Sequence, residues 1–258
     1  MLQGATLAQA GIDAVAIKPA EVDVERAAHL DVDALAIDYE GREHLPSPET
    51  LADLAAGADV RVTTPVRADG FDPLGDGDLA AALPDDVRRV LVAGHPAYLT
   101  DAERERAVAP RLRQAAAASE DPWVGTEGIE RIALAVGGTQ FELLGPGTDR
   151  RLRSLRQAGY DGDVAVYAPT VLTDDEDSVL DALGDYAARR GPVRSALPES
   201  AATDASATGR AREVISQAVR DYGLVGDIED VTDRVDELTD AGADHVVGYP
   251  ARGLDPLL

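Results

Sequence analysis

One helix followed directly by one strand, within residues 222–250, constrains the fold of this chain more than any other feature. Asp227 is a favoured N-terminal cap, and Gly242 is typical of a residue that ends a helix in the left-handed conformation. Between these two positions, apolar residues recur at helical spacing, namely Ile228, Val231, Val235 and Leu238. The run from His245 to Pro250 has the apolar character of a buried strand. Such a unit is typical of parallel α/β proteins, so we expect that class.

Upstream of this unit, short apolar runs alternate with helical segments. The strands expected from these runs are 14–19, 34–38, 60–66, 90–93 and 164–168, in addition to 245–250. The length of 258 residues suits one (β/α)₈ barrel, so we treat 1–258 as a single domain. These strands fall short of the eight of a complete barrel, and we expect one βα unit to be altered or missing.

Two further segments carry specific expectations. The apolar runs on either side of the sequence GGTQ at 137–140 are too close together for a parallel crossover. We therefore predict an antiparallel hairpin near 132–145. Residues 192–209 are rich in Ala, Ser, Thr and Pro, a composition that predicts an exposed insertion.

The charge of the chain restricts its partners. Acidic residues number 48 against 24 basic ones, and Lys18 is the single lysine. So acidic a surface repels nucleic acid and anionic membranes, and it suits a halophilic source in which salt screens the repulsion. The absence of cysteine excludes disulfides and thiolate catalysis. With no signal peptide and no long apolar run, we expect a cytoplasmic protein with a small-molecule substrate; a homodimer stays open.

The segment from Val225 to Val247 also resembles the last αβ unit of the bacterial-luciferase-like family of flavin- and deazaflavin-dependent barrel enzymes. Val225, Gly226, Glu229 and the run AGADHVV at 241–247 fit the family pattern, whereas Asp227-Ile228 replace its usual Thr/Ser-Pro. The resemblance implies a (β/α)₈ barrel that binds coenzyme F420 or FMN. It also implies a hydride-transfer oxidoreductase, in which the coenzyme carries the redox chemistry.

Candidate catalytic residues lie where the expected strands end, because parallel barrels place their sites at the carboxyl ends of the strands. Asp38 ends the second strand, where the family often has an acid, and Tyr39 occupies the position of the family's histidine. His95 ends the fourth strand, and histidine is the natural acid or base at neutral pH. Each also has a purely structural reading, such as a strand-end aspartate that caps a loop.

Candidate coenzyme-binding residues follow from the same resemblance. Thr64 partly matches a deazaflavin motif at the end of the third strand, and Gly94 precedes His95. Gly145, Gly147 and Thr148 open a helix whose free N–H groups can hold a phosphate. Arg252, after the last strand, can bind a phosphate or carboxylate through two hydrogen bonds. No two histidines have metal-binding spacing, so we expect no metal.

Two alternatives to the oxidoreductase remain. In one, the barrel has lost its catalytic site and serves in binding or assembly, since the motifs of the second and third strands are incomplete. In the other, Lys18 acts as an amine nucleophile in a phosphate-binding isomerase or lyase, which requires a second acid beside it.

Overall fold

Parallel strands closed into a barrel form the centre of the molecule. The computed structural model describes residues 4–95, 98–125 and 128–255. The barrel strands are β1 (Ala14–Ile17), β2 (Ala34–Ile37), β3 (Asp59–Pro65), β4 (Arg88–Val92), β5 (Trp123–Gly125), β6 (Thr139–Leu143), β7 (Val164–Leu172) and β9 (His245–Pro250). Each pairs in parallel with the next, and β9 pairs with both β7 and β1 and so closes the circle. The short β8 (Leu224–Gly226) pairs with the end of β7, beyond the part of β7 that pairs with β6. The predicted (β/α)₈ barrel is confirmed, with all eight barrel strands present.

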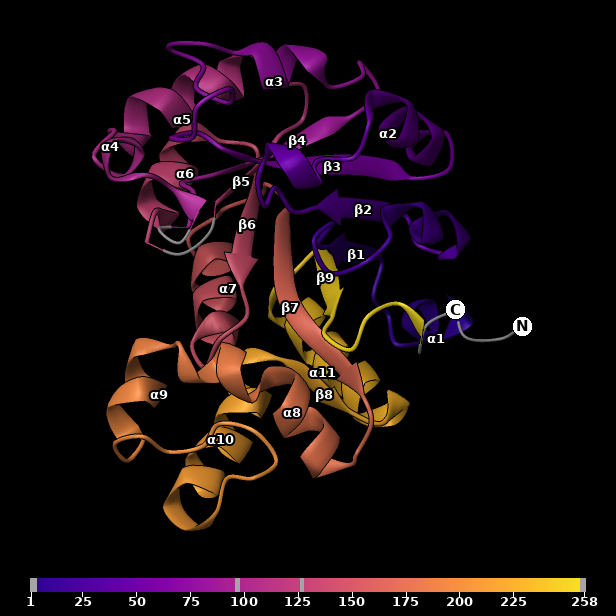
Figure 1. Ribbon diagram of the computed structural model, residues 1–258, viewed down its shortest axis with the longest axis vertical. Coiled ribbons are helices and arrows are strands. Elements are labelled where there is room, and N and C mark those ends of the chain that lie inside the picture. The colour runs from indigo at the N-terminus through magenta and orange to yellow at the C-terminus, as the bar shows by residue number, and fades with distance from the viewer. Residues whose placement is uncertain (1–3, 96–97, 126–127, 256–258) are drawn as a thin grey trace.

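Helices surround the barrel and join its strands. They are α1 (Gly4–Gln9), η1 (Val24–His29), η2 (Arg42–His44), α2 (Pro48–Ala55), α3 (Asp78–Ala82), α4 (Asp101–Arg104), α5 (Val108–Ala117), α6 (Glu130–Val136), α7 (Thr148–Gln157), α8 (Glu176–Ala188), α9 (Gly191–Ala196), α10 (Gly209–Tyr222) and α11 (Ile228–Ala241). Figure 1 shows that α8, α9 and α10 form a lobe at one end of the molecule. Within 192–209, Val193 is buried in the hydrophobic cluster that this lobe encloses.

The αβ unit that we expected from residues 222–250 is confirmed. The Asp227 carboxylate caps α11 by accepting hydrogen bonds from the N–H groups of Glu229 and Asp230. Gly242 ends the helix with a φ of 118°, which a residue with a side chain rarely adopts. The apolar stripe Val231, Val235 and Leu238 is buried against the barrel, whereas Ile228 is partly exposed.

The predicted hairpin near 132–145 is wrong. Residues 130–136 form α6, and the strand after it, β6, pairs in parallel with β5 and β7. The strand before α6 is β5, which has only three residues and gave no recognisable apolar run. Gly137 and Gly138, with φ of 93° and 82°, turn the chain sharply enough for α6 to serve as the crossover. The βα unit that seemed missing from the sequence is therefore present but very short.

Side chains fill the interior of the barrel. Small residues on β1 and β2 face large ones on β5, β6 and β7, and the small ones are Ala14, Ala16, Ala34 and Ala36. The large residues form a column of rings in which Trp123 stacks on Phe141 with centroids 5.8 Å apart. Phe141 contacts Tyr167 edge-on at 5.9 Å, and Tyr167 stacks on Tyr249 at 6.4 Å. Because the interior is occupied, a ligand must bind at an end of the barrel rather than within it.

Candidate active site at the carboxyl end of the barrel

A charged and aromatic cluster lies at the carboxyl ends of β1, β2 and β9, with Tyr167 of β7 stacked on Tyr249 of β9. We call it the mouth and define it by Lys18, Glu21, Asp38, Tyr167 and Tyr249. The Lys18 ammonium lies 4.1 Å from the centre of the Tyr249 ring, and its Nζ is 3.4 Å from Glu21 Oε1. The Tyr249 hydroxyl donates a hydrogen bond to Glu21. These contacts fix Lys18, Glu21 and Tyr249 relative to one another at the top of the aromatic column.

Asp38, an acid of the mouth, has a raised pKa. Burial raises the pKa of its carboxyl from 3.8 to about 7; the charge of Lys18 opposes the rise, and Glu40 and Glu21 add to it. Tyr167 lies close enough that the charge of Asp38 contributes, after burial, to raising the pKa of its hydroxyl. A carboxyl half-protonated at neutral pH has the property that general acid–base catalysis requires.

The segment after β4 forms part of the rim. Gly94 has a φ of 87°, and a Cβ at this position would lie 3.0 Å from a Leu99 methyl group and 3.1 Å from the Pro65 Cβ. Only glycine suits this bend, after which His95 is exposed to solvent. The rings of His95 and Tyr98 lie 6.0 Å apart. Gly94 and His95 thus lie shortly after β4, as the sequence indicated, and their roles stay a prediction.

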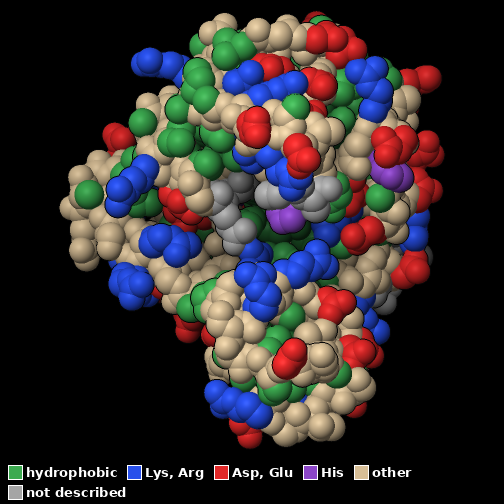
Figure 2. Space-filling view, turned by 60° about the vertical axis from the view of Figure 1, so that its left-hand side comes forward, with side chains coloured by type: hydrophobic (Ala, Val, Ile, Leu, Met, Phe, Trp, Pro, Cys, Tyr) green, Lys and Arg blue, Asp and Glu red, His purple; other side chains and the backbone are tan. Residues whose placement is uncertain are grey.

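Tyr98, on this rim, has a hydroxyl that is influenced by the charges of the mouth acids. Its hydroxyl has a raised pKa, caused by partial burial and then by the charges of Glu40, Glu21 and Asp38, while Arg189 lowers it. The hydroxyl therefore lies within electrostatic range of these carboxylates and of Arg189. Figure 2 shows a hollow on this side of the molecule, with hydrophobic side chains and a histidine inside it. Lys and Arg side chains lie along the rim that the lobe forms.

Thr64 does not face the mouth. It is fully buried, donates to the Val62 carbonyl and accepts from Arg89 Nε, each at 3.3 Å. Its neighbour Thr63 points to the barrel side instead, and its hydroxyl accepts the Tyr39 N–H at 2.6 Å. Successive strand residues face opposite sides of a sheet. The residue of this motif that faces the barrel side is therefore Thr63, one position before the predicted Thr64.

Gly145, Gly147 and Thr148 form an ordered turn before α7. The Thr148 hydroxyl is fully buried and accepts from the Gly145 N–H at 3.0 Å and from Arg151 Nη2 at 3.1 Å. Gly147 is the N-terminal cap residue of α7, and a Cβ there would lie 3.0 Å from Arg151 Nη1 and 3.6 Å from Arg150 Nη2. The turn therefore combines a helix N-terminus with two arginines, which is chemistry suited to a phosphate.

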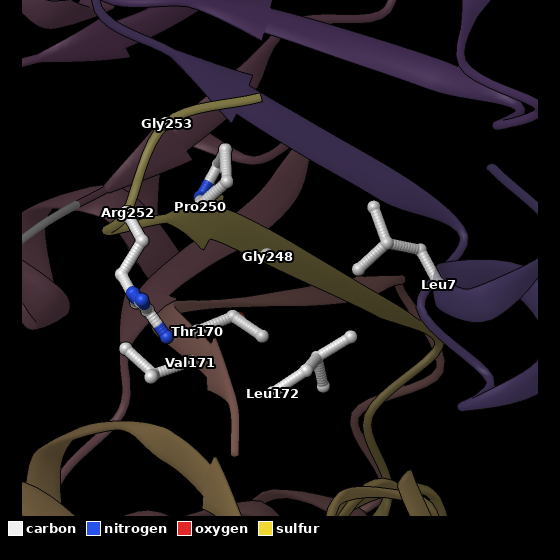
Figure 3. A pocket seen from close by; sticks show the side chains of 8 residues that line it. All are labelled: Leu7, Thr170, Val171, Leu172, Gly248, Pro250, Arg252 and Gly253. Atoms are coloured by element: carbon white, nitrogen blue, oxygen red, sulfur yellow. The ribbon is translucent and has the colours of Figure 1, made fainter. Parts of the chain in front are cut away.

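Arg252 lies apart from these groups. It lines a cavity of about 30 Å³ on the outer face of β7 and β9, together with Leu7, Thr170, Val171, Leu172, Gly248, Pro250 and Gly253. Figure 3 shows its side chain reaching from the segment after β9 toward Val171. The inward residues of β9 are His245, Val247 and Tyr249, so Gly248 and Pro250 face outward with Arg252. The structure does not bring Arg252 to the mouth, and the cavity is too small for a coenzyme.

A second cluster of polar residues lies at the amino ends of the strands, and it was not predicted from the sequence. It surrounds a cavity of about 280 Å³ lined by Asp13, Asp33, Ala34, Asp59, Arg61, Arg88, Asp121, Trp123 and His245. Arg61 is 3% exposed and donates to Asp59 Oδ2, the Asp121 carbonyl and Asp121 Oδ2 at 2.7–2.9 Å. The His245 Nδ1 lies 2.8 Å from Asp13 Oδ2. The signal available in the sequence was an aspartate just before several strands.

Sequence comparison places the chain in a family. Residues 7–257 match a family described as "Family of unknown function (DUF7388)". The chain belongs to this family. No curated protein sequence matches it. Within the part of this DUF7388 member that the structure describes, no helix has both the length and the apolar character needed to cross a membrane.

Solved structures share the fold of this DUF7388 protein. One is an F420-dependent secondary alcohol dehydrogenase in complex with an F420–acetone adduct, with a TM-score of 0.61 and 12% identity over 94% of this chain and 93% of that one. Another is the coenzyme F420-dependent tetrahydromethanopterin reductase from Methanopyrus kandleri, with a TM-score of 0.64 and 15% identity over 94% of each chain. At these identities the similarity establishes the fold alone, a closed parallel (β/α)₈ barrel.

Proposed function

We propose that this protein is an oxidoreductase that binds a deazaflavin or flavin coenzyme at the mouth, F420 ahead of FMN, and transfers a hydride to or from a small molecule. The observation that carries the proposal is Asp38, a carboxyl whose pKa is about 7, placed at the carboxyl end of a filled barrel. Two structures of the same fold belong to F420-dependent enzymes, which supports F420 as the first coenzyme to test.

The residues present fit such a coenzyme in their chemistry. A flat ring needs an apolar or aromatic floor, and the top of the barrel interior offers the rings of Tyr167 and Tyr249, which stack on each other. A coenzyme phosphate needs N–H donors and cations, and the turn before α7 offers Gly147 with Arg150 and Arg151. The bound coenzyme would supply the hydride chemistry, which no side chain of this protein provides.

Within this proposal, Asp38 moves the proton that accompanies hydride transfer. Oxidation of an alcohol releases a proton from its oxygen, and reduction of a carbonyl takes one up. A carboxyl with a pKa near 7 can accept or give that proton at neutral pH. Lys18 limits the rise of this pKa, and Glu21 positions both Lys18 and the Tyr249 hydroxyl. His95 is the second candidate for proton exchange, at the rim.

The lyase alternative, with Lys18 as nucleophile, receives less support. Lys18 does lie beside two acids, Glu21 and Asp38, as that mechanism requires. A nucleophilic amine must lose its charge, however, and both the ion pair with Glu21 and the contact with the Tyr249 ring favour the charged ammonium. Failure of borohydride to trap a covalent adduct with carbonyl compounds would agree with this argument.

Fluorescence titration with F420 and with FMN tests the proposal directly. We expect saturable binding of at least one coenzyme to the intact protein in molar salt. We also expect that Asp38→Asn retains binding but loses turnover, because the asparagine keeps the shape and lacks the proton. No binding of either coenzyme at millimolar concentration would refute the proposal. Equal turnover by the wild type and Asp38→Asn would refute the role of Asp38, whereas binding without turnover in the wild type would favour a barrel that has lost catalysis.

A further inference from the structure

We propose that the cavity at the amino ends of the strands, which we call the amino-end cavity, binds a small zwitterion of the amino-acid class. The ammonium group of the ligand would meet Asp33, and its carboxylate would meet Arg88. The proposal concerns the end of the barrel opposite the mouth and does not depend on the function proposed above. The cavity has a volume of about 280 Å³, near the lower end of the range of ligand pockets, roughly 300–1,000 Å³.

The amino-end cavity opens at the end of the barrel and not on its outer wall. Its lining residues belong to β9, β1, β2, β3, β4 and β5, or lie just before one of them, and these strands are consecutive neighbours in the sheet. On the inner side, the Arg61 guanidinium lies 4.5 Å from the centre of the Trp123 ring, and each of these residues is 3% exposed. Trp123 is also the end of the column of rings that fills the barrel, so the cavity is closed toward the interior.

Some lining charges already have partners, and these pairs fix the walls of the cavity. Arg61 donates to Asp59 Oδ2 at 2.8 Å and to the carbonyl and carboxylate of Asp121 at 2.7 and 2.9 Å. Asp13 Oδ2 lies 2.8 Å from His245 Nδ1. Side chains that are held in place before a ligand arrives lose little conformational entropy when it binds, so such walls favour binding.

Other lining groups are open to a ligand, and they carry both signs. The Asp33 carboxylate makes no hydrogen bond or ion pair with any residue that the structure describes. Arg88 Nη1 pairs with Asp59 Oδ1 at 2.9 Å, whereas Arg88 Nη2 has no partner in the described part of the chain. The indole N–H of Trp123 likewise donates to no described residue, although this side chain is nearly fully buried. A buried donor without a partner costs free energy, which a ligand that accepts from it recovers.

A zwitterion satisfies these open groups together. Asp33 precedes β2 and Arg88 begins β4, on either side of Asp59 at the start of β3, so a ligand between them meets opposite charges at its two ends. A simple anion would be repelled by Asp33, and a simple ammonium ion would leave Arg88 Nη2 and the indole N–H without an acceptor. Within the described ranges, no group of three or more His, Cys, Asp or Glu side chains is arranged to hold a metal ion. The open donors and acceptor therefore favour an organic ligand with both charges.

The single tryptophan of the chain lines this cavity, so its fluorescence reports on binding there. The wild type, Asp33→Asn, Arg88→Gln and the control Asp31→Asn are titrated with the common L-amino acids at constant ionic strength. Asp31 is an exposed carboxylate of the same loop and does not line the cavity. We expect at least one amino acid to change the Trp123 emission saturably. Its affinity should fall about tenfold in Asp33→Asn and in Arg88→Gln, the order expected for one charge-assisted contact, and stay unchanged in the control.

Two analogues of the amino acid that binds best test the assignment of its charged groups on the wild type alone, so they decide even where a variant fails to fold. The amine that lacks the carboxylate and the hydroxy acid that lacks the ammonium should each bind about tenfold more weakly. Melting temperatures with the same ligands give a second measure of binding.

Three results would overturn the proposal. The first is that no amino acid changes the emission or the melting temperature at tens of millimolar. The second is that either analogue binds as tightly as the amino acid, or that Asp33→Asn and Arg88→Gln bind it like the wild type. The third is a ligand that raises the melting temperature without changing the Trp123 emission, because such a ligand binds elsewhere.

Discussion

Replacing Asp38 by asparagine should stabilise the protein at neutral and alkaline pH while it removes the proposed proton carrier. The native pKa of Asp38 is about 7 against an ordinary value of 3.8, because burial disfavours the charged carboxylate. The native state thus binds this proton more tightly than the unfolded state does. The stability that the neutral carboxyl provides is complete below the unfolded pKa, and it is lost as the pH rises through the native one.

The size of the effect follows from the shift. A rise from 3.8 to about 7 is roughly three units, and each unit corresponds to about 1.4 kcal/mol, so the ionised carboxylate costs the native state up to about 4 kcal/mol. Asparagine imitates the neutral carboxyl at every pH. The stability gained by Asp38→Asn should therefore be near zero below about pH 4, grow by about 1.4 kcal/mol per unit above it, and level off above about pH 7.

Urea unfolding of the wild type and Asp38→Asn, in molar salt across this pH range, measures the difference. Other carboxylates titrate in both proteins alike, so their contributions cancel in the comparison. Lys18→Met provides a matched test, because loss of its charge should raise the pKa of Asp38 further and lower the stability at alkaline pH. A stability difference between the wild type and Asp38→Asn that does not change with pH would refute the argument, since it would show that Asp38 titrates normally in the native state.

Three further perturbations test other parts of the molecule. Arg61→Met should lower the free energy of unfolding by about 3 kcal/mol in urea titrations, since two carboxylates lose a buried partner; a loss under about 1 kcal/mol would contradict this estimate. Asp13 raises the pKa of His245, so Asp13→Asn should destabilise most below about pH 6.5 and less as the pH rises through the native histidine pKa; a difference that grows with pH would contradict it. With a net charge of −24, the melting temperature should rise from low to molar potassium chloride, and a flat series would argue against adaptation to salt.

Local sequence signals were sufficient wherever an element is long enough to show its period. The helix α11 has a cap, a buried stripe and a glycine stop within 16 residues, and the structure reproduces each of them. The strand β5 has only three residues, too few to show an alternation of apolar and polar residues. Because β5 was not recognised in the sequence, its neighbours were wrongly predicted to form a hairpin. An isolated stretch does not reveal whether two apolar runs pair with each other or with distant strands, because strand pairing is a tertiary property.

The candidate site shows the same limit. Asp38 could be placed because it directly follows β2, and Gly94 and His95 because they lie shortly after β4, which ends at Val92. Arg252 also follows a strand, yet the chain turns it to the outer face of β9, and no periodicity extends past the strand to predict that turn.

The two ends of the barrel differ in how their charges are balanced, and this difference supports the proposal that the mouth is the catalytic end. At the amino end, Arg61 donates to two aspartates and His245 pairs with Asp13, so most charges already have partners within the protein. At the mouth, burial disfavours the charged form of the Asp38 carboxyl and raises its pKa. Arrangements that cost native stability cluster at functional sites, which agrees with the role proposed for Asp38. The predicted gain in stability on replacing Asp38, together with a loss of turnover, is the combination that a purely structural carboxyl would not produce.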